Sequence, residues 1–359
     1  MDSALTQPLG RAEEHIRNVV PDSSWASQSE IFDSFESATT DFQRKCEQCQ
    51  DELAFIFSNM DDVSYQSVST QALLNKWEKA PQLCSAPAMV IVAFERMGIT
   101  YSEDNYPFMA ALVAAFLAEV PNELDYHNNM HFRKVLLHTI RMIVAHNRIF
   151  AETQNFLDDS AISKLIIAAC IHDLGHQAKG NIIDREYHMA LTEKRSFRLA
   201  LPFLESVGLS RQEIDDISVM VMATDASPIG DPVSPSNQLR RAYEYHFGSK
   251  EAVDALELSD EFKVFEQNSD LCLLAMILHE ADIMNSAAVS YEITVQESIA
   301  LSRELNRTNA LPEDTLLFLE KICSGQMLSD SARFLGSDNL RDIMAQVLKD
   351  FENGNTSYF

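Results

Sequence analysis

The sequence ISKLIIAACIHDLGH, residues 162–176, is an apolar run that ends in adjacent His172 and Asp173. Its apolar residues recur at helical spacing and the neighbouring positions are also apolar, so we predict a helix buried inside the protein. Burying an imidazole beside a carboxylate is costly unless a partner compensates their polarity and charge. A divalent cation binds both groups together. The first hypothesis is therefore a metal site at the C-terminal end of this helix.

The composition favours an all-α protein. The 359 residues include only 10 Gly and 11 Pro, and long stretches are rich in Ala, Leu, Met and Glu. A hydrophobic content of 46% is enough for a sizeable core in one large or two ordinary domains. We expect core helices at residues 86–97, 106–120 and 270–283, a helix from about 186 to 207, and an irregular loop at 228–240.

The charge balance limits the partners. The formal net charge of -26 repels phosphate backbones and anionic membranes, so a nucleic-acid partner is excluded. A small anionic substrate stays compatible, because a bound metal can reverse the potential inside one pocket. The N-terminus has no secretory signal and the apolar run at 108–118 is too short to span a bilayer. We therefore expect a cytoplasmic protein without membrane insertion.

The cysteines suggest no disulfide framework. Cys170 and Cys272 lie in apolar runs, where a reduced buried thiol is expected. Cys46 and Cys49 form a single CxxC without a second pair, and we interpret them as exposed thiols on a helix.

Two further motifs bring histidines and carboxylates to helical segments. His127 and His131 are four residues apart where a new helix opens, and they share one face if that helix already includes both. The apolar segment 270–283 ends, like the first, in a histidine and an aspartate, His279 and Asp282. Two buried helices that each deliver such a pair are hard to explain by core packing alone.

Four motifs in this order resemble the class I cyclic nucleotide phosphodiesterases. They are Tyr126-His127-Asn128-x-x-His131, His172-Asp173-x-x-His176 followed by Asn181, Ala223-Thr224-Asp225, and Ile277-Leu278-His279-x-Ala281-Asp282. The resemblance implies a compact multi-helix catalytic domain of the HD type at 81–350. Residues 1–80 would form an N-terminal helical extension, which packs on the main body or makes a homodimer contact, and residues 351–359 a disordered tail.

The resemblance also implies a cyclic nucleotide as substrate, cAMP or cGMP, and a role for each matching residue. The first cation, Zn²⁺, would be held by His131, His172, Asp173 and Asp282, and Asp173 would reach a second ion, Mg²⁺ or Mn²⁺. His127 matches the general acid. The groups that orient water around the ions would be His176, Glu193 and Thr224, and the base would contact Asn285 and Gln326.

The chain departs from the family pattern at several loop positions. Ala178 stands where the family usually has glycine, and Arg195 and Ser196 replace a pair of histidines. No aromatic residue stands three positions after Gln326. Two alternatives therefore stay open: another HD-type metallophosphohydrolase, or a nucleotide-binding sensor that has lost turnover.

Overall fold

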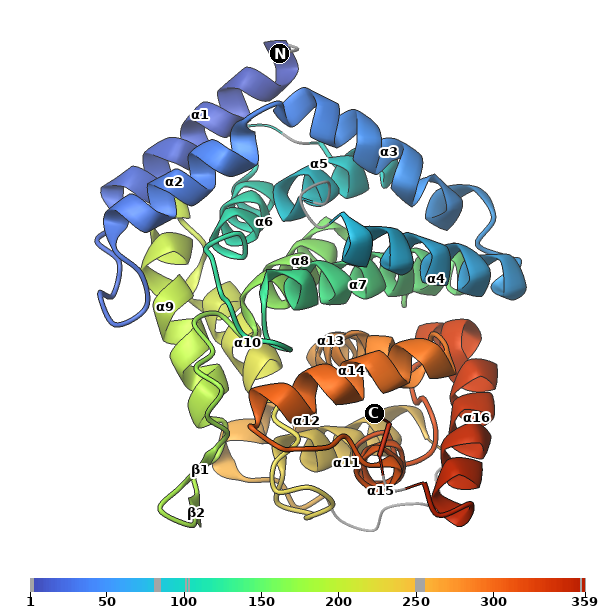
Figure 1. The fold of residues 1–359 in the computed structure, drawn as a ribbon. Helices are drawn as coiled ribbons and strands as arrows, with labels where there is room; N and C mark the ends of the chain where they lie inside the picture. Colours follow the sequence, from blue (N-terminus) through green and yellow to red (C-terminus); the bar gives the residue numbers. More distant parts are fainter. Residues whose placement is uncertain are drawn as a thin grey trace.

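The computed structural model describes residues 3–80, 85–100, 102, 104–248, 256–355 and 357–358. Almost all of the regular structure in these ranges is α-helical, as the composition predicts. Figure 1 shows the N-terminal helices along one side of the molecule, the central helices beneath them, and the C-terminal helices on the opposite side. The first group consists of α1 (Ser3–Asn18), α2 (Gln28–Thr39), α3 (Phe42–Ser58) and α4 (Val63–Lys79).

The N-terminal helices pack on the main body of the protein. Helices α1 and α2 contact α6 (Tyr106–Leu117), α3 contacts α5 (Ala86–Arg96), and α4 contacts α16 (Asp330–Glu352). Buried residues of α1, α2 and α3 belong to the same hydrophobic cluster as the central helices. Packing on the body, one of the two alternatives for residues 1–80, is therefore what the described residues do, while the boundary at residue 80 stays a prediction.

The centre of the fold is built from strongly apolar helices. Helix α6 packs on α8 (Asp159–Ile171), and α7 (Asn129–Ile149) packs on both α8 and α13 (Ser269–Ala287). Nearly every side chain of α6, α8 and α13 is buried. Burial on all sides is the reason that these segments are apolar all round. The three helices α7, α8 and α13 carry the histidines and aspartates of interest.

The remaining elements surround this centre. Helix α9 runs from Leu191 to Val207, and α10 (Arg211–Met222) begins with a capping box in which Ser210 and Glu213 satisfy each other's backbone N–H groups. The others are α11 (Pro235–Phe247), a 3-10 helix at Asp260–Phe262, α12 (Val264–Gln267), α14 (Tyr291–Glu304), α15 (Pro312–Leu317) and a π-helical turn at Phe318–Ile322.

Several boundaries differ from the sequence-based expectation. The helix expected from residue 186 begins at Leu191, because Glu186–Tyr187 pairs with Ile182–Ile183 as a two-stranded hairpin, β2 with β1. The loop expected at 228–240 ends at Ser234, since Pro235 occupies the first turn of α11, where proline is tolerated. The helix expected at 270–283 continues to Ala287, so Asp282 does not lie at its end.

The cysteines behave partly as predicted. Cys170 and Cys272 are buried free thiols, as expected. Cys46 and Cys49 are also buried, so the prediction of exposed thiols is wrong. Their helix, α3, packs against α5 and α7, and burial raises the pKa of the Cys46 thiol to about 12. These thiols are packing residues.

The C-terminal part of the chain closes the fold. Helix α16 ends at Glu352, and the backbone N–H of Tyr358 donates to the carbonyl of Ala310 at 3.0 Å. Residues 356 and 359 of the predicted tail lie outside the described part. No single helix in that part is long and apolar enough to cross a membrane; α13 and α14 meet the test only together, and they bend by 99° at their junction.

Candidate metal and acid site

The predicted ligands come together from three central helices. His131 lies in the first turn of α7, and Asn128 caps this helix by accepting the backbone N–H of Met130 and of His131. The helix begins only at Asn129, so His127 lies in the preceding loop and does not share a helical face with His131. Because Asn128 caps α7 between them, His127 lies in the loop and His131 lies in the helix.

The apolar stretch delivers the second pair as predicted. His172 is the C-cap of α8, and Asp173 follows in the turn. The Nδ1 atom of His172 lies 2.9 Å from the carbonyl oxygen of Ala169, so it donates its hydrogen there. With Nδ1 bonded in this way, the Nε2 atom of His172 faces the other side chains of the cluster, which is the usual arrangement of a metal-binding histidine.

Four side-chain atoms form a compact cluster. From His131 Nε2 the distances are 3.2 Å to His172 Nε2, 3.3 Å to Asp173 Oδ2 and 3.2 Å to Asp282 Oδ1. His172 Nε2 lies 3.2 Å from Asp173 Oδ2 and 3.5 Å from Asp282 Oδ1. A tetrahedral ion with ligands at about 2.0–2.1 Å requires ligand separations of about 3.3–3.4 Å. The five separations are close to these values, and His131, His172 and Asp282 form a group of potential ligands for one divalent cation.

The carboxylates and imidazoles of the cluster compensate each other's charges. Burial raises the pKa of Asp173, but His172 and His127 outweigh it and hold that pKa well below its usual range. Burial lowers the pKa of His131, but hydrogen bonds that its ring donates to Asp173 and Asp282 raise that pKa to about 9. The imidazoles thus retain protons that compensate the buried carboxylates. A bound cation would replace the protons on the imidazole Nε2 atoms, because metal ligands bind in their deprotonated form.

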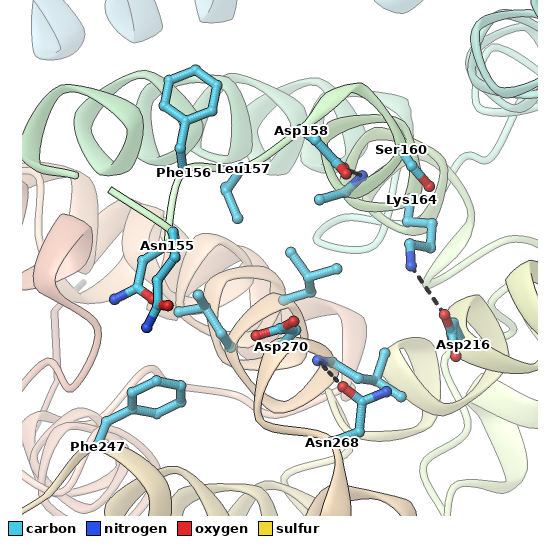
Figure 2. Close-up of a pocket in the computed structure, with 15 residues that line it drawn as sticks. Asn155, Phe156, Leu157, Asp158, Ser160, Lys164, Asp216, Phe247, Asn268 and Asp270 are labelled. Carbon is cyan, nitrogen blue, oxygen red and sulfur yellow. Dashed lines mark hydrogen bonds and ion pairs between the residues drawn. The ribbon is translucent and has the colours of Figure 1, made fainter. Parts of the chain in front are cut away.

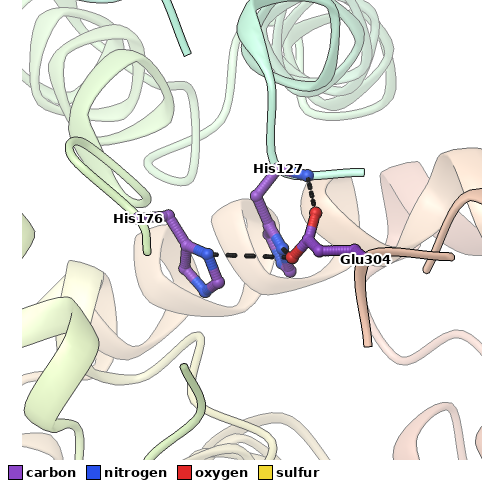
Figure 3. A group of neighbouring side chains, drawn as sticks. All are labelled: His127, His176 and Glu304. Carbon is purple, nitrogen blue, oxygen red and sulfur yellow. Dashed lines mark hydrogen bonds and ion pairs between the residues drawn. The ribbon is translucent and has the colours of Figure 1, made fainter. Parts of the chain in front are cut away.

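His127 forms a dyad with Glu304, the last residue of α14 (Figure 3). Glu304 Oε1 lies 2.5 Å from His127 Nδ1, and Glu304 Oε2 accepts the backbone N–H groups of His127 at 2.9 Å and Tyr126 at 2.8 Å. Burial raises the pKa of Glu304, but the hydrogen bond and charge of His127 lower it to about 2. The carboxylate is therefore ionised, and His127 Nδ1–H donates to it.

His176 stacks on His127 at the edge of the cluster. Their ring centroids are 3.8 Å apart, and the backbone N–H of Ala178 donates to His176 Nδ1 at 3.1 Å. Burial and the charge of His127 lower the pKa of His176 to about 4, so its ring is neutral. Figure 3 shows His127, His176 and Glu304 as a second group of potential ligands. The 2.5 Å separation within it is too short for two ligands of one ion, so we interpret this group as a hydrogen-bonded dyad with a stacked ring.

Glu193 is close enough to the cluster for the charge of Asp173 to act on it, whereas Thr224 has no described contact with the cluster. Glu193 accepts a hydrogen bond from Asn181 Nδ2 at 2.9 Å, and burial and the charge of Asp225 raise its pKa well above the usual range. Thr224 donates its hydroxyl to the carbonyl of Val221 at 2.9 Å. Asp225 accepts from Tyr187 and from the backbone N–H of Ala190, which anchors the hairpin next to α9.

The two predicted base contacts are placed differently from each other. Asn285, one turn after Asp282 on α13, is buried, and its Oδ1 lies 3.4 Å from His138 Nε2. Gln326 is exposed in the loop before α16, where its backbone carbonyl accepts from Arg240. Neither side chain has a described contact with the histidine cluster, so their predicted role stays a prediction.

Glu304 belongs to the candidate site, but no sequence motif predicts it. It lies on an amphipathic helix in a chain with 54 acidic residues, so neither its type nor its spacing distinguishes it. Its side chain is only 1% exposed. A buried carboxylate needs a partner, but the sequence does not show which acidic residues are buried.

A separate cavity of about 330 Å³ lies at the far ends of α8 and α13 (Figure 2). Phe156 and Phe247 flank it, and Asp158 and Asn268 cap the two helices beside it. His172 lies thirteen residues beyond Asp159, which is about 20 Å along a helix. This cavity is therefore separate from the histidine cluster.

No family model matches the sequence, and no curated protein sequence matches it. The fold is similar to the phosphodiesterase domain of the RhoPDE fusion protein from the choanoflagellate Salpingoeca rosetta, with a TM-score of 0.55 and 18% identity over 75% of this chain and 92% of that chain. It is also similar to LmjPDEB1 in complex with IBMX, with a TM-score of 0.54 and 15% identity over 78% of this chain and 91% of that one. The predicted all-α phosphodiesterase-domain fold is thus confirmed.

Proposed function

We propose that the protein is a metal-dependent phosphodiesterase that hydrolyses a 3′,5′-cyclic nucleotide, cAMP or cGMP, to the 5′-monophosphate. One observation carries this proposal: an oriented histidine, His127, stands beside a ligand cluster of the right spacing for a cation. His127 Nε2 lies 3.9 Å from Asp173 Oδ2, so the acid and the cluster border the same space. The fold similarity supports the proposal.

The residues that would hold the cations follow from the cluster. His131, His172, Asp173 and Asp282 would hold Zn²⁺, and Asp173 would also reach the second ion, Mg²⁺ or Mn²⁺, whose remaining ligands would be water. When bound, the cations supply positive charge to the phosphoryl oxygens and a water of lowered pKa. His176, Glu193 and Thr224 are the residues that we propose to orient that water.

His127 would provide the proton for the departing 3′ oxygen. Its Nδ1–H is held by Glu304, so the second proton of the imidazolium lies at Nε2 and faces Asp173. The oxygen of one water ends on phosphorus, the bond from phosphorus to the 3′ oxygen breaks, and the Nε2 proton moves to that oxygen. A proton from the water then restores the imidazolium, so the net reaction consumes one water.

The base would bind beside an apolar cavity next to the proposed acid. Tyr126, next to His127, lines an apolar cavity of about 80 Å³ together with Leu301, Leu305 and Phe318. We propose that the base approaches along this wall, with Asn285 and Gln326 as the predicted polar contacts. If Gln326 contacts the base, Gln326→Ala raises KM and leaves kcat unchanged.

A second candidate is another phosphoester substrate for the same site. The observation in its favour is that Asn285 is buried and hydrogen-bonded to His138, while Gln326 is exposed. Neither side chain is therefore positioned to bind a purine base. This candidate keeps the roles of the cluster and of His127 and changes only the leaving group.

The test of the proposal is turnover of cAMP and cGMP by the purified protein with Zn²⁺ and Mg²⁺ or Mn²⁺. The proposal predicts hydrolysis of at least one nucleotide, which His127→Ala reduces roughly 10²- to 10⁴-fold. Hydrolysis of other phosphodiesters without either nucleotide would favour the second candidate. A folded, metal-loaded protein that hydrolyses none of them would contradict both and favour a nucleotide-binding sensor.

A further inference from the structure

Lys134 is a buried cation that joins three distant parts of the chain. It lies on α7, one turn after His131, and its side chain is only 10% exposed. Its Nζ atom is 2.5 Å from Glu78 Oε1 on α4 and 2.8 Å from Glu297 Oε1 on α14. Burial lowers the pKa of Lys134, but Glu297 and Glu78 outweigh it and raise that pKa, so the ammonium is charged.

Helix α14 connects this ion pair to the acid dyad. Glu297 and Glu304 are seven residues apart on α14, which places both on one face of the helix, two turns from each other. The same face therefore meets α7 at Lys134 and the loop before α7 at His127. Helix α14 bends by 99° from α13 and packs on α13 and α16, and Lys134 joins it to α7.

We propose that Lys134 is a positioning residue for the acid, which holds α14 so that Glu304 meets His127, and that Glu78 makes the N-terminal helices part of this support. The proposal rests on the role of His127 in the proposed function. Without Lys134, the Glu297 carboxylate, whose side chain is 9% exposed, would be left without its cation. A buried unpaired charge draws water or moves toward solvent, and α14 would shift with it.

The two carboxylates differ in what they contribute. Glu297 is buried and sits on the helix that carries Glu304, whereas the side chain of Glu78 is 49% exposed. An exposed partner contributes less, because water screens it. Loss of Glu78 should therefore produce a smaller effect of the same kind as loss of Lys134.

The direct readout is the proton between His127 and Glu304. It is observed by ¹H NMR in protein labelled with ¹⁵N-histidine, because a short hydrogen bond to a carboxylate moves the Nδ1–H proton resonance far downfield. Loss of this resonance in His127→Ala assigns it to His127. We expect the signal to be absent in Lys134→Met, retained in Lys134→Arg and weakened in Glu78→Gln. Asp61→Asn is the matched control, because it removes another ion pair to α7, that of Asp61 with Arg148, whose side chains are 71% and 63% exposed.

Turnover of the cyclic nucleotide gives the second readout. We expect kcat to fall about tenfold in Lys134→Met, about two- to fivefold in Glu78→Gln, and not at all in Asp61→Asn, with KM unchanged throughout, because the acid acts in the transition state. Lys134→Arg should restore most of the rate. Circular dichroism confirms the fold, and Glu78→Gln tests the proposal if Lys134→Met does not fold.

The outcomes separate this inference from the proposed function. A wild-type protein with the downfield signal and no cyclic nucleotide turnover would contradict the proposed function, and loss of the signal in Lys134→Met would still support the positioning role. An unchanged signal and rate in Lys134→Met would overturn the inference. An effect of Lys134→Met with none in Glu78→Gln would overturn the part assigned to the N-terminal helices.

Discussion

Replacing Glu304 by glutamine tests the acid dyad with the smallest change of shape. Two backbone N–H groups, of Tyr126 and His127, point at Oε2, and His127 Nδ1–H points at Oε1. The glutamine oxygen must take the Oε2 position to satisfy the backbone donors, so its NH₂ group faces the Nδ1–H of His127. Two donors then oppose each other, and His127 must give up its Nδ1 proton or rotate.

The size of the effect follows from the bond that is lost. A hydrogen bond to a charged group contributes about 1.5–3 kcal/mol, which corresponds to a loss of roughly 10- to 100-fold in a rate that needs the imidazolium. The assay compares two substrates. The leaving group of a cyclic nucleotide is the 3′ oxygen, a poorly stabilised alkoxide that needs a proton from the acid. The leaving group of a nitrophenyl phosphodiester is a stable nitrophenolate, so its departure depends little on the acid.

We therefore expect kcat for the cyclic nucleotide to fall by roughly 10- to 100-fold in Glu304→Gln and kcat for the nitrophenyl ester to fall by less than about threefold. His127→Ala is the matched control and should show the same selectivity. The double variant should be no slower than His127→Ala, because residues that act as one unit are not additive. Equal losses on both substrates, or no loss, would refute the role of the dyad.

Three further predictions concern the cluster and its loop. Zinc at 100 times its Kd should stabilise the protein by about 2.7 kcal/mol, seen as a rise of roughly 3–4 °C in Tm, and Asp282→Asn should abolish the rise. An undiminished rise in that variant would exclude Asp282 as a ligand. Gly175→Ala should lower the free energy of unfolding in urea by about 1–2 kcal/mol, because Gly175 has φ of +66° and an added Cβ would lie 2.6 Å from Leu199 Cδ1. A stability equal to that of the wild type would show that the loop relaxes freely. Ala178→Gly should stabilise by about 1 kcal/mol, since Ala178 has φ of +54°; a loss of stability would mean that the methyl group contributes packing that outweighs the strain.

The sequence predicts the centre of this fold well because burial on all sides leaves a strong signal. The run at 162–176 predicts a buried helix that ends in a histidine and an aspartate, and α8 ends at Ile171 with His172 as its cap. Helices α5 and α6 also appear where continuous apolar runs predict them. The boundaries of amphipathic helices leave a weaker signal in the sequence, since a proline such as Pro235 is compatible with both a loop and the first turn of a helix.

The candidate site was predictable only where its residues stand in short motifs. His131, His172, Asp173 and Asp282 come from three such motifs, and the structure brings their side chains together. Glu304 and Lys134 lie outside the motifs, and each is buried only because a partner from a distant helix compensates its charge. Local sequence shows neither the burial nor the partner, because both arise from tertiary packing.

The separation of His127 from His131 shows the same limit at close range. The i, i+4 spacing is compatible with one helical face, but Asn128 satisfies the first N–H groups of α7 and ends the helix there. The His127 ring contacts Glu304, while the His131 ring faces His172, Asp173 and Asp282. The two histidines do not share a helical face, since capping decides where the helix begins.

The measurement that tests the central claim most directly is hydrolysis of a cyclic nucleotide by the metal-loaded protein in ¹⁸O-labelled water, followed by ³¹P NMR and mass spectrometry of the product. The account predicts a 5′-monophosphate with one ¹⁸O on phosphorus, formed by the wild type and lost in Asp282→Asn and in protein treated with a chelator. Formation of the 3′-monophosphate, or equal turnover with and without metal, would contradict the account, because His127 and the cluster would then not act on the 3′ oxygen as the geometry requires.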